Sequence, residues 1–227
     1  MKNYEVIAFD LDGTLSNPET GLIASFSYAL KRMGVDFGNP MSLKRFIGPP
    51  LFEEWQKVYG FSPEESSEAL MIFREYFAVY GWWDNKMYDG IPEMLKALKA
   101  HGKKIVLATS KPEIFAKKIL RLFDIDKYFD FIGGASTDKT RDKKWEVLEY
   151  VLDSIGSPNR EKCILVGDRK YDAEGAKLCG IDSLGVLYGH GSFDELSNAG
   201  FTDTVKTVSD ITDYFVGKSG EITENNM

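Results

Sequence analysis

Short apolar runs alternate with helix-like segments along most of the chain. The run Tyr4–Phe9 is rich in β-branched and aromatic residues and breaks at Asp10 into a polar turn containing glycine. Such a run is typical of a buried strand. Similar runs predict further strands at Lys104–Ala108, Tyr128–Ile132, Cys163–Val166 and Ser183–Leu187, the last of them. Helical patterns lie between them, at Pro92–Ala100, from Pro112, at Trp145–Ile155 and at Ala173–Leu178. This alternation predicts an α/β fold, a parallel sheet with helices on both faces.

The stretch from about Pro18 to Tyr80 has a different pattern. Its apolar residues recur at three- and four-residue spacing, which predicts a helical insertion. Ser62 and Pro63 supply an N-cap and a first helical residue, with Glu65 placed to complete a capping box. The helix that follows should bury one stripe, made of Leu70, Phe73, Phe77 and Tyr80.

These patterns predict a core that is interrupted by a helical insertion. Residues 1–16 and 86–217 form the predicted core, and residues 17–85 form the insertion. Residues 218–227 are polar and lack apolar periodicity, so we expect them to be disordered. A chain of 227 residues with 43% hydrophobic content is long enough for one core with such an insertion.

Composition narrows the classes of function. A net charge of −7 argues against a partner that is a nucleic acid polymer or an anionic membrane, because both need a concentrated basic surface. The sequence has no run of about 18 apolar residues, so we expect a cytoplasmic protein. Cys163 and Cys179 lack a CxxC spacing and a nearby histidine, which favours buried free thiols over a disulfide or a zinc site.

Polar residues follow several of the predicted strands. Asp10 and Asp12 come after the first strand, Thr109 and Ser110 after the second, and Asp168 after the fourth. Carboxyl ends of parallel strands meet at one edge of a sheet, so these side chains should share a crevice. Two carboxylates as close as Asp10 and Asp12 repel each other unless a cation or a proton lies between them. The pattern predicts an active site at this edge.

The motifs resemble those of the haloacid dehalogenase superfamily of phosphatases. The resemblance rests on Asp10-Leu11-Asp12-Gly13-Thr14, Thr109, Lys144 and the segment Gly167–Asp172. An insertion after the first strand resembles the members that have a helical cap of the C1 type. The segments Phe46–Leu51 and Tyr88–Ile91 resemble the phosphoglycolate-phosphatase-like and 5′-nucleotidase-like subgroup. This resemblance implies a Rossmann-like core with an inserted helical cap domain.

The resemblance also implies roles for individual residues. Asp10 is the expected nucleophile, and Asp12 the expected acid and then base. The expected Mg²⁺ ligands are Asp10, Asp168 and the main-chain carbonyl of Asp12, with Asp172 acting through a water. Thr109, Ser110 and Lys144 are expected to bind the substrate phosphate, and Arg45, Gly48 and Pro49 of the cap to set specificity. Lys143 and Lys144 are adjacent, and counting back from the helix that follows favours Lys144.

Some of these residues also have ordinary structural interpretations. Thr109 on its own could cap the helix that opens at Pro112, and Asp172 could cap the helix near Ala173. Arg169 and Lys170 are expected to be surface charges without a role. His190, in a Gly-His-Gly loop, is a weak candidate for a position beside the site.

The expected function is therefore a magnesium-dependent phosphatase of small cytosolic phosphate monoesters, with a cap that closes over the substrate. Phosphoglycolate, a nucleoside monophosphate and a sugar phosphate all remain open as substrates, and the protein could be a monomer or a homodimer. One alternative is a phosphomutase of the β-phosphoglucomutase type, which returns the phosphoryl group to a sugar. Others are a dehalogenase and a non-enzymatic phospho-aspartate switch module, which has no need of a substrate chamber.

Overall fold

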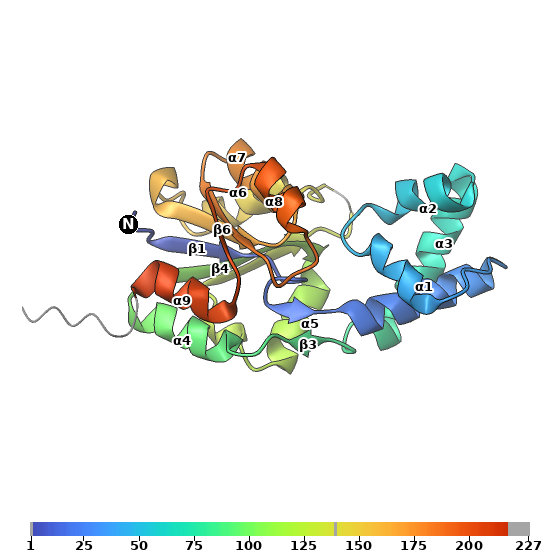
Figure 1. Ribbon diagram of the computed structural model, residues 1–227, viewed down its shortest axis with the longest axis horizontal. Coiled ribbons are helices and arrows are strands. Elements are labelled where there is room, and N and C mark those ends of the chain that lie inside the picture. The colour runs from blue at the N-terminus through green and yellow to red at the C-terminus, as the bar shows by residue number, and fades with distance from the viewer. Residues whose placement is uncertain (1, 139, 218–227) are drawn as a thin grey trace, which may run out of the picture. The chain divides into compact units, whose positions relative to one another are not determined.

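The computed structural model of the protein describes residues 2–138 and 140–217 (Figure 1). The chain divides into two compact units. The core unit contains the chain up to Leu15 and the chain from Met87 onward, and the helical unit contains Ser16–Lys86. The expectation of disorder for residues 218–227 falls outside the described residues.

The core unit is built on a six-stranded sheet in which every pair of neighbours is parallel. Its strands are β1 (Val6–Phe9), β4 (Lys104–Pro112), β5 (Phe131–Ala135), β6 (Cys163–Gly167), β7 (Asp182–Val186) and β8 (Asp203–Val205), in the order β5-β4-β1-β6-β7-β8. All four residues of β1 are buried, because both faces of this central strand are covered. The predicted parallel α/β fold is confirmed.

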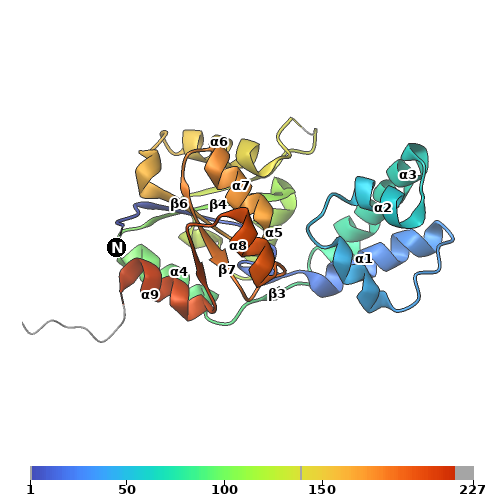
Figure 2. The ribbon, with the colours of Figure 1, turned by 45° about the horizontal axis from the view of Figure 1, so that its top comes forward.

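Helices cover both faces of this sheet. They are α4 (Ile91–Ala100), α5 (Glu113–Leu122), α6 (Lys144–Ser154), α7 (Lys170–Leu178), α8 (Phe193–Ala199) and α9 (Val208–Val216), with 3-10 turns at Asp126–Tyr128 and Arg160–Lys162. Figures 1 and 2 show α6 and α7 on one face and α4 and α9 on the other. On the first face Val6 and Ala8 of β1 pack with Val147 and Val151 of α6. Burial of this apolar surface is the main force that stabilises the core.

Three details of the sheet differ from the sequence-based prediction. The strand at Asp182–Val186 is not the last, because β8 adds a sixth strand at the edge. β8 is only three residues long, too short to give a periodic signal. β4 continues to Pro112 through an irregularity in its pairing after Thr109. β5 begins at Phe131 and not at Tyr128, because the preceding residues form a 3-10 turn.

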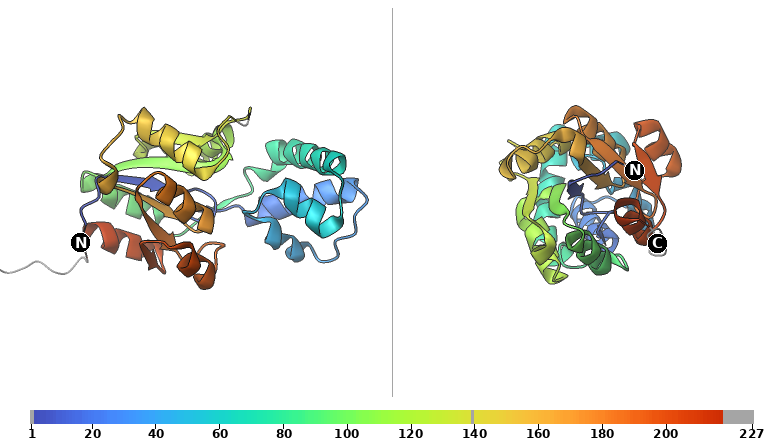
Figure 3. Two further views of the ribbon diagram at one scale, coloured as in Figure 1. Left: turned by 90° about the horizontal axis from the view of Figure 1, so that it is seen from above. Right: turned by 90° about the vertical axis from the view of Figure 1, so that its left-hand side faces the viewer.

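The helical unit contains an aromatic core. Its helices are α1 (Glu19–Arg32), α2 (Leu51–Tyr59) and α3 (Pro63–Tyr76), with a 3-10 segment at Pro40–Phe46 and a π turn at Phe77–Gly81. Phe26, Phe46, Trp55 and Phe73 pack together, with three edge-on ring pairs centred on Trp55 at 6.5 Å. The short strands β2 (Ser16–Asn17) and β3 (Lys86–Met87) form a separate two-stranded sheet. Figure 3 gives two further views of these elements.

The start of α3 is as predicted, but its apolar stripe ends early. Ser62 accepts a hydrogen bond from Glu65 N and Glu65 returns one to Ser62 N, which confirms the capping box. The prediction that Tyr80 belongs to the core is wrong, because Tyr80 is 56% exposed. The π turn that begins at Phe77 adds a residue to the last turn and rotates Tyr80 away from the stripe. Among the described residues, no helix is both long enough and apolar enough to cross a membrane.

Candidate active site

Polar side chains from several elements meet at the carboxyl edge of the core sheet. Asp10 follows β1, Asp168 follows β6, and Thr109 and Lys111 lie near the end of β4. β1 is hydrogen-bonded to β4 on one side and to β6 on the other, so the ends of these three strands are adjacent. Lys144 is the first residue of α6. The sheet thus assembles a site from residues that are more than 150 positions apart, Thr14 and Asp168 among them.

Three buried carboxylates form a compact acidic cluster. Asp10, Asp168 and Asp172 each place one oxygen within 4.8 Å of the others. Burial, followed by the negative charges of Asp172 and Asp10, raises the pKa of Asp168 well above its usual range. Burial is also the largest cause of the raised pKa of Asp172. Such a cluster favours a bound cation, and a divalent ion with oxygen ligands suits it best.

The backbone approaches this cluster so closely that glycine is required. Gly13 has a φ of +86°, and a Cβ atom built there would lie 2.1 Å from an oxygen of Asp168. A Cβ on Gly167 would lie 2.2 Å from the carboxyl carbon of Asp172. The glycines of the first and last motifs are thus explained by space around the acids and, at Gly13, also by backbone conformation.

Lys144 lies against two of the three acids. Its Nζ atom is 2.7 Å from Asp10 Oδ1 and 2.7 Å from Asp172 Oδ1, and it also donates to the carbonyl oxygen of Ala108 at 3.0 Å. Burial alone would lower the pKa of Lys144, but the two carboxylates outweigh burial and raise it. Lys143 is exposed at the N-cap of α6, so the structure places Lys144 and not its neighbour in the site.

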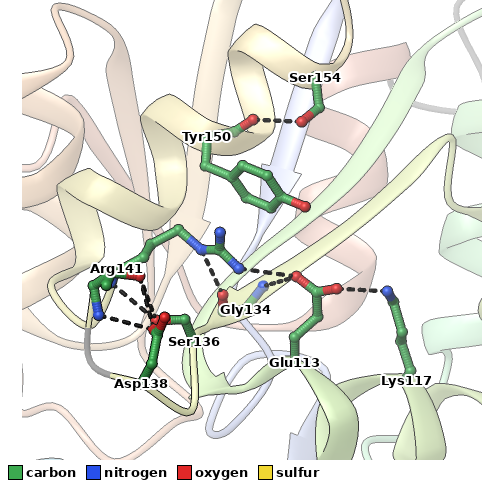
Figure 4. A network of polar contacts seen from close by, with 9 residues as sticks. Glu113, Lys117, Gly134, Ser136, Asp138, Arg141, Tyr150 and Ser154 are labelled. Carbon is green, nitrogen blue, oxygen red and sulfur yellow. Dashed lines mark hydrogen bonds and ion pairs between the residues drawn. The ribbon is translucent and has the colours of Figure 1, made fainter.

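A polar network holds the loop that leads to Lys144 (Figure 4). Arg141 Nε donates to the carbonyl oxygen of Gly134 at 3.0 Å, and Arg141 Nη2 donates to Glu113 Oε2 at 3.2 Å. The guanidinium also lies 3.7 Å from the ring centroid of Tyr150, within cation–π distance. Because Gly134 is in β5, Glu113 in α5 and Tyr150 in α6, one arginine ties the loop to three elements.

The site contains a second lysine, Lys111, which contacts Asp12 and which sequence analysis missed. Lys111 Nζ is 2.5 Å from Asp12 Oδ2, and the lysine side chain is only 6% exposed. The other oxygen of Asp12, Oδ1, is buried and has no hydrogen-bond partner among the described residues. A signal for Lys111 was present, because it lies two residues after Thr109 and alternate residues of a strand share a face.

Thr109 and Ser110 differ in their surroundings. Thr109 is buried, and its hydroxyl oxygen accepts a hydrogen bond from Lys111 N at 3.2 Å. This contact uses a lone pair of the hydroxyl and leaves its hydrogen for another acceptor. Thr109 does not cap α5, whose N-cap residue is Pro112. Ser110 is exposed, so of the two only Thr109 is enclosed by the site.

The loop after β7 supports Asp168. His190 N donates to Asp168 Oδ2 at 2.7 Å, and Thr14 Oγ1 lies 3.5 Å from Asp168 Oδ1. His190 thus lies beside the site, where its backbone N–H makes this contact. Next to Asp168, Arg169 pairs with Glu195 at 2.8 Å and is 17% exposed at its side chain. The prediction that Arg169 is only a surface charge is therefore wrong, because this pair ties α7 to α8.

Asp172 also has the helix-capping role that its position suggested. Its Oδ2 atom accepts a hydrogen bond from Arg169 N at 3.0 Å, as a residue in the first turn of α7. Its Oδ1 atom faces Lys144. The two oxygens of one carboxylate therefore serve the helix and the acidic cluster at the same time.

The predicted specificity residues belong to the helical unit. Arg45 is exposed, and its guanidinium lies 5.7 Å from the ring centroid of Phe46. Gly48 is exposed with a φ of +104°, at the turn before Pro49 and α2. These observations describe the turn within its own unit, so the role of Arg45, Gly48 and Pro49 stays a prediction.

A parallel sheet that gathers buried carboxylates and lysines at its carboxyl edge defines the class of this protein as an α/β enzyme. The particular family follows from comparison with known proteins. The model of the haloacid dehalogenase-like hydrolase family matches residues 7–186, and the chain belongs to this family. The predicted family is thus confirmed.

Individual relatives carry several names. A 5′-nucleotidase of Pseudomonas aeruginosa is 44% identical over 193 residues, which cover 85% of this chain and 87% of the relative. The tyrosine-protein kinase PtkA of Mycobacterium tuberculosis is 36% identical over 198 residues, covering 87% of this chain and 67% of the relative. A crystal structure from Clostridium difficile, of a protein provisionally assigned as a phosphatase, has a TM-score of 0.88 and 47% identity over 95% of this chain and 100% of that one.

Proposed function

We propose that this protein is a magnesium-dependent phosphatase that hydrolyses nucleoside monophosphates or similar small phosphate monoesters through an aspartyl phosphate. The observation that carries the proposal is the position of Asp10, which follows the central strand, belongs to the acidic cluster and contacts Lys144 at 2.7 Å. A phosphate monoester is a poor electrophile surrounded by negative charge. A carboxylate nucleophile therefore needs nearby cations and a fixed orientation.

In the first step, an oxygen of Asp10 attacks phosphorus as the bond from phosphorus to the leaving oxygen breaks. The phosphoryl group is then held on Asp10 as an acyl phosphate. Lys144 lies 2.7 Å from Asp10 Oδ1 and offsets charge on the phosphoryl oxygens. Thr109 donates the hydrogen of its hydroxyl to one of these oxygens.

Asp12 moves the proton in both steps. It gives its proton to the leaving oxygen in the first step, so that an alcohol and not an alkoxide departs. In the second step it takes a proton from water, whose oxygen attacks phosphorus. The bond from Asp10 to phosphorus then breaks, and inorganic phosphate and the free carboxylate of Asp10 are formed.

The residues of the acidic cluster fit a magnesium ion. Asp10 and Asp168 would offer carboxylate oxygens, and Asp172 would act through a water. We also assign the main-chain carbonyl of Asp12 to the ion. The cluster has three buried carboxylates, of which Lys144 contacts two, and this leaves negative charge that a divalent cation would offset. When bound, the ion neutralises phosphoryl oxygens and aligns the ester for attack.

The substrate class is supported by the 5′-nucleotidase of Pseudomonas aeruginosa, which is 44% identical to this chain. We assign selection of the leaving group to the helical unit and to Arg45, Gly48 and Pro49 in particular. Arg45 is an exposed cation that could contact a second polar group of the substrate.

Phosphate release from a panel of esters tests the proposal. Nucleoside monophosphates, phosphoglycolate and sugar phosphates are each assayed with Mg²⁺ and with a chelator, and Asp10→Asn serves as the blank. We expect magnesium-dependent release that is fastest with a nucleoside monophosphate and equals the amount of ester consumed.

Each other outcome has its own meaning. Faster release from phosphoglycolate or a sugar phosphate would overturn the substrate class and keep the reaction. Loss of ester without equivalent phosphate would favour a phosphomutase. A long-lived phosphorylated Asp10 that does not turn over would favour a switch module.

A further inference from the structure

The ion pair between Lys111 and Asp12 has no part in the mechanism given above. We infer that Lys111 is a positioning residue that holds the carboxyl group of Asp12 in the orientation needed for proton transfer to the leaving group. This inference rests on the proposed role of Asp12 as the acid.

The pair is short and mostly buried. Lys111 Nζ lies 2.5 Å from Asp12 Oδ2, and the side chains of the two residues are 6% and 24% exposed. Charge-assisted hydrogen bonds are stronger than neutral ones, and limited access of water weakens their screening. The lysine is thus more buried than the acid that it contacts, as expected for a residue that positions a reactive group.

The contact makes the two oxygens of Asp12 different. Oδ2 is occupied by Lys111, whereas Oδ1 is buried without a hydrogen-bond partner among the described residues. The contact with Lys111 therefore fixes the rotation of the Asp12 carboxyl group, which is the group proposed to transfer the proton. During transfer the bond from the proton to the Asp12 carboxyl group breaks, and a bond from the proton to the leaving oxygen forms as the bond from that oxygen to phosphorus breaks. Free rotation of the carboxyl group would lose this alignment.

The backbone around Lys111 departs from regular strand geometry. The pairing of β4 with β5 shifts between Thr109 and Pro112, and such irregularities redirect side chains at the ends of strands. A Cβ on Gly134 would lie 2.6 Å from the carbonyl oxygen of Lys111, so this glycine admits the displaced backbone. Lys111 N donates to Thr109 Oγ1. One residue therefore links the acid to the threonine that is proposed to bind phosphate.

The leaving group offers a test that separates positioning from general support. An alkyl alcohol needs a proton to depart, whereas p-nitrophenolate does not. We would measure kcat/KM of Lys111→Met with the alkyl phosphate that the wild-type protein hydrolyses fastest and with p-nitrophenyl phosphate. We expect a loss of about 10- to 100-fold with the alkyl ester and of less than about 3-fold with the aryl ester. Lys111→Arg should recover part of the loss, because it keeps a cation beside Asp12.

Lys99→Met is the matched control. Lys99, in α4, also pairs with an aspartate, Asp130, at 2.8 Å, and it has no role in the mechanism. Its loss should leave the ratio of the two kcat/KM values unchanged. Thermal unfolding of every variant monitors folding, and Lys111→Gln replaces Lys111→Met if the latter does not fold.

Asp12→Asn separates the failure of this inference from the failure of the mechanism. It should lose about 10²- to 10⁴-fold with the alkyl ester and much less with the aryl ester. If Asp12→Asn shows this selectivity and Lys111→Met loses both activities equally, Lys111 is not a positioning residue for the acid. If Asp12→Asn itself loses both activities equally, the proposed acid role of Asp12 is wrong and the inference falls with it.

Discussion

The two units of this protein bury different kinds of side chain. Every buried charged residue among those that the structure describes lies in the core unit. They are Asp10, Lys111, Lys144, Asp168 and Asp172. The buried polar residues of the helical unit are the neutral serines Ser16, Ser25 and Ser66, and its interior is an aromatic cluster around Trp55.

This difference separates the residues to which we assign chemistry from the residues that pack the helical unit. Buried charges contribute little to stability, because the loss of hydration offsets the attraction between them. Packed aromatic rings contribute both apolar burial and favourable ring contacts. Substitutions in the core site should therefore lower activity more than stability, and substitutions in the aromatic cluster should do the opposite.

The largest effect is expected at the proposed nucleophile. Asp10→Asn should lower phosphate release by at least about 10⁴-fold, because an amide cannot form the acyl phosphate. Its free energy of unfolding should change little, since Lys144 keeps Asp172 as a partner. Urea unfolding and an assay with a nucleoside monophosphate measure the two quantities. Substantial residual turnover would remove Asp10 from the mechanism.

The helical unit should show the reverse behaviour at Trp55. Trp55→Ala should lower the free energy of unfolding by about 3–5 kcal/mol, because it leaves a cavity among Phe26, Phe46 and Phe73. Trp55→Phe is the milder control, since it keeps a ring and removes an indole N–H that is buried without a partner among the described residues. A loss of less than about 1 kcal/mol for Trp55→Ala would contradict the importance of this cluster.

Binding of Mg²⁺ to the acidic cluster should increase the stability of the folded core unit. At 100 times its dissociation constant, Mg²⁺ should stabilise the folded protein by about 2.7 kcal/mol, which corresponds to a rise of roughly 5–10 °C in Tm. The physical reason is relief of repulsion among Asp10, Asp168 and Asp172. A thermal scan with increasing Mg²⁺ measures the rise, and Asp168→Asn should reduce it strongly. An unchanged Tm for the wild type at millimolar Mg²⁺ would argue against the site.

A smaller effect is expected at Arg141, where a substitution should lower both stability and activity. Arg141→Lys should lower the free energy of unfolding by about 1 kcal/mol, because lysine cannot reproduce both hydrogen bonds and the contact with Tyr150. The loop before Lys144 should become less ordered, so kcat should also fall. Lys117→Met, which removes only an exposed partner of Glu113, is the control. Equal behaviour of the two variants would show that the arginine does not hold this loop.

The smallest effect concerns the two thiols of the core. Burial raises the pKa of Cys163 to about 11 and that of Cys179 to about 12. A thiol pKa that is higher in the folded state contributes stability below the unfolded value of about 8.5, and this stability is lost as pH rises toward 11. At pH 8 both thiols should react slowly with iodoacetamide until urea is added. Rapid labelling of the folded protein would contradict their burial.

In both units, sequence analysis found the features that depend on adjacent residues and missed features that depend on packing. In the core, the strand Val6–Phe9 and the acids after it follow from a local apolar run and a glycine turn, both visible in adjacent residues. In the helical unit, the capping box at Ser62 is equally local and was predicted correctly. The π turn at Phe77 was not predicted, because a single added residue in a turn depends on the packing around it.

Local patterns therefore specified the strand and helix types, the family and the residues from which a site could be built. Contacts between distant residues arose from folding, since no local pattern encodes which side chains meet. Lys111 meets Asp12 across 99 positions of sequence, and Lys144 meets Asp10 across 134. The order of strands in the sheet brings these residues together, and burial at its edge turns ordinary acids and lysines into a site in which two lysines are paired with acids.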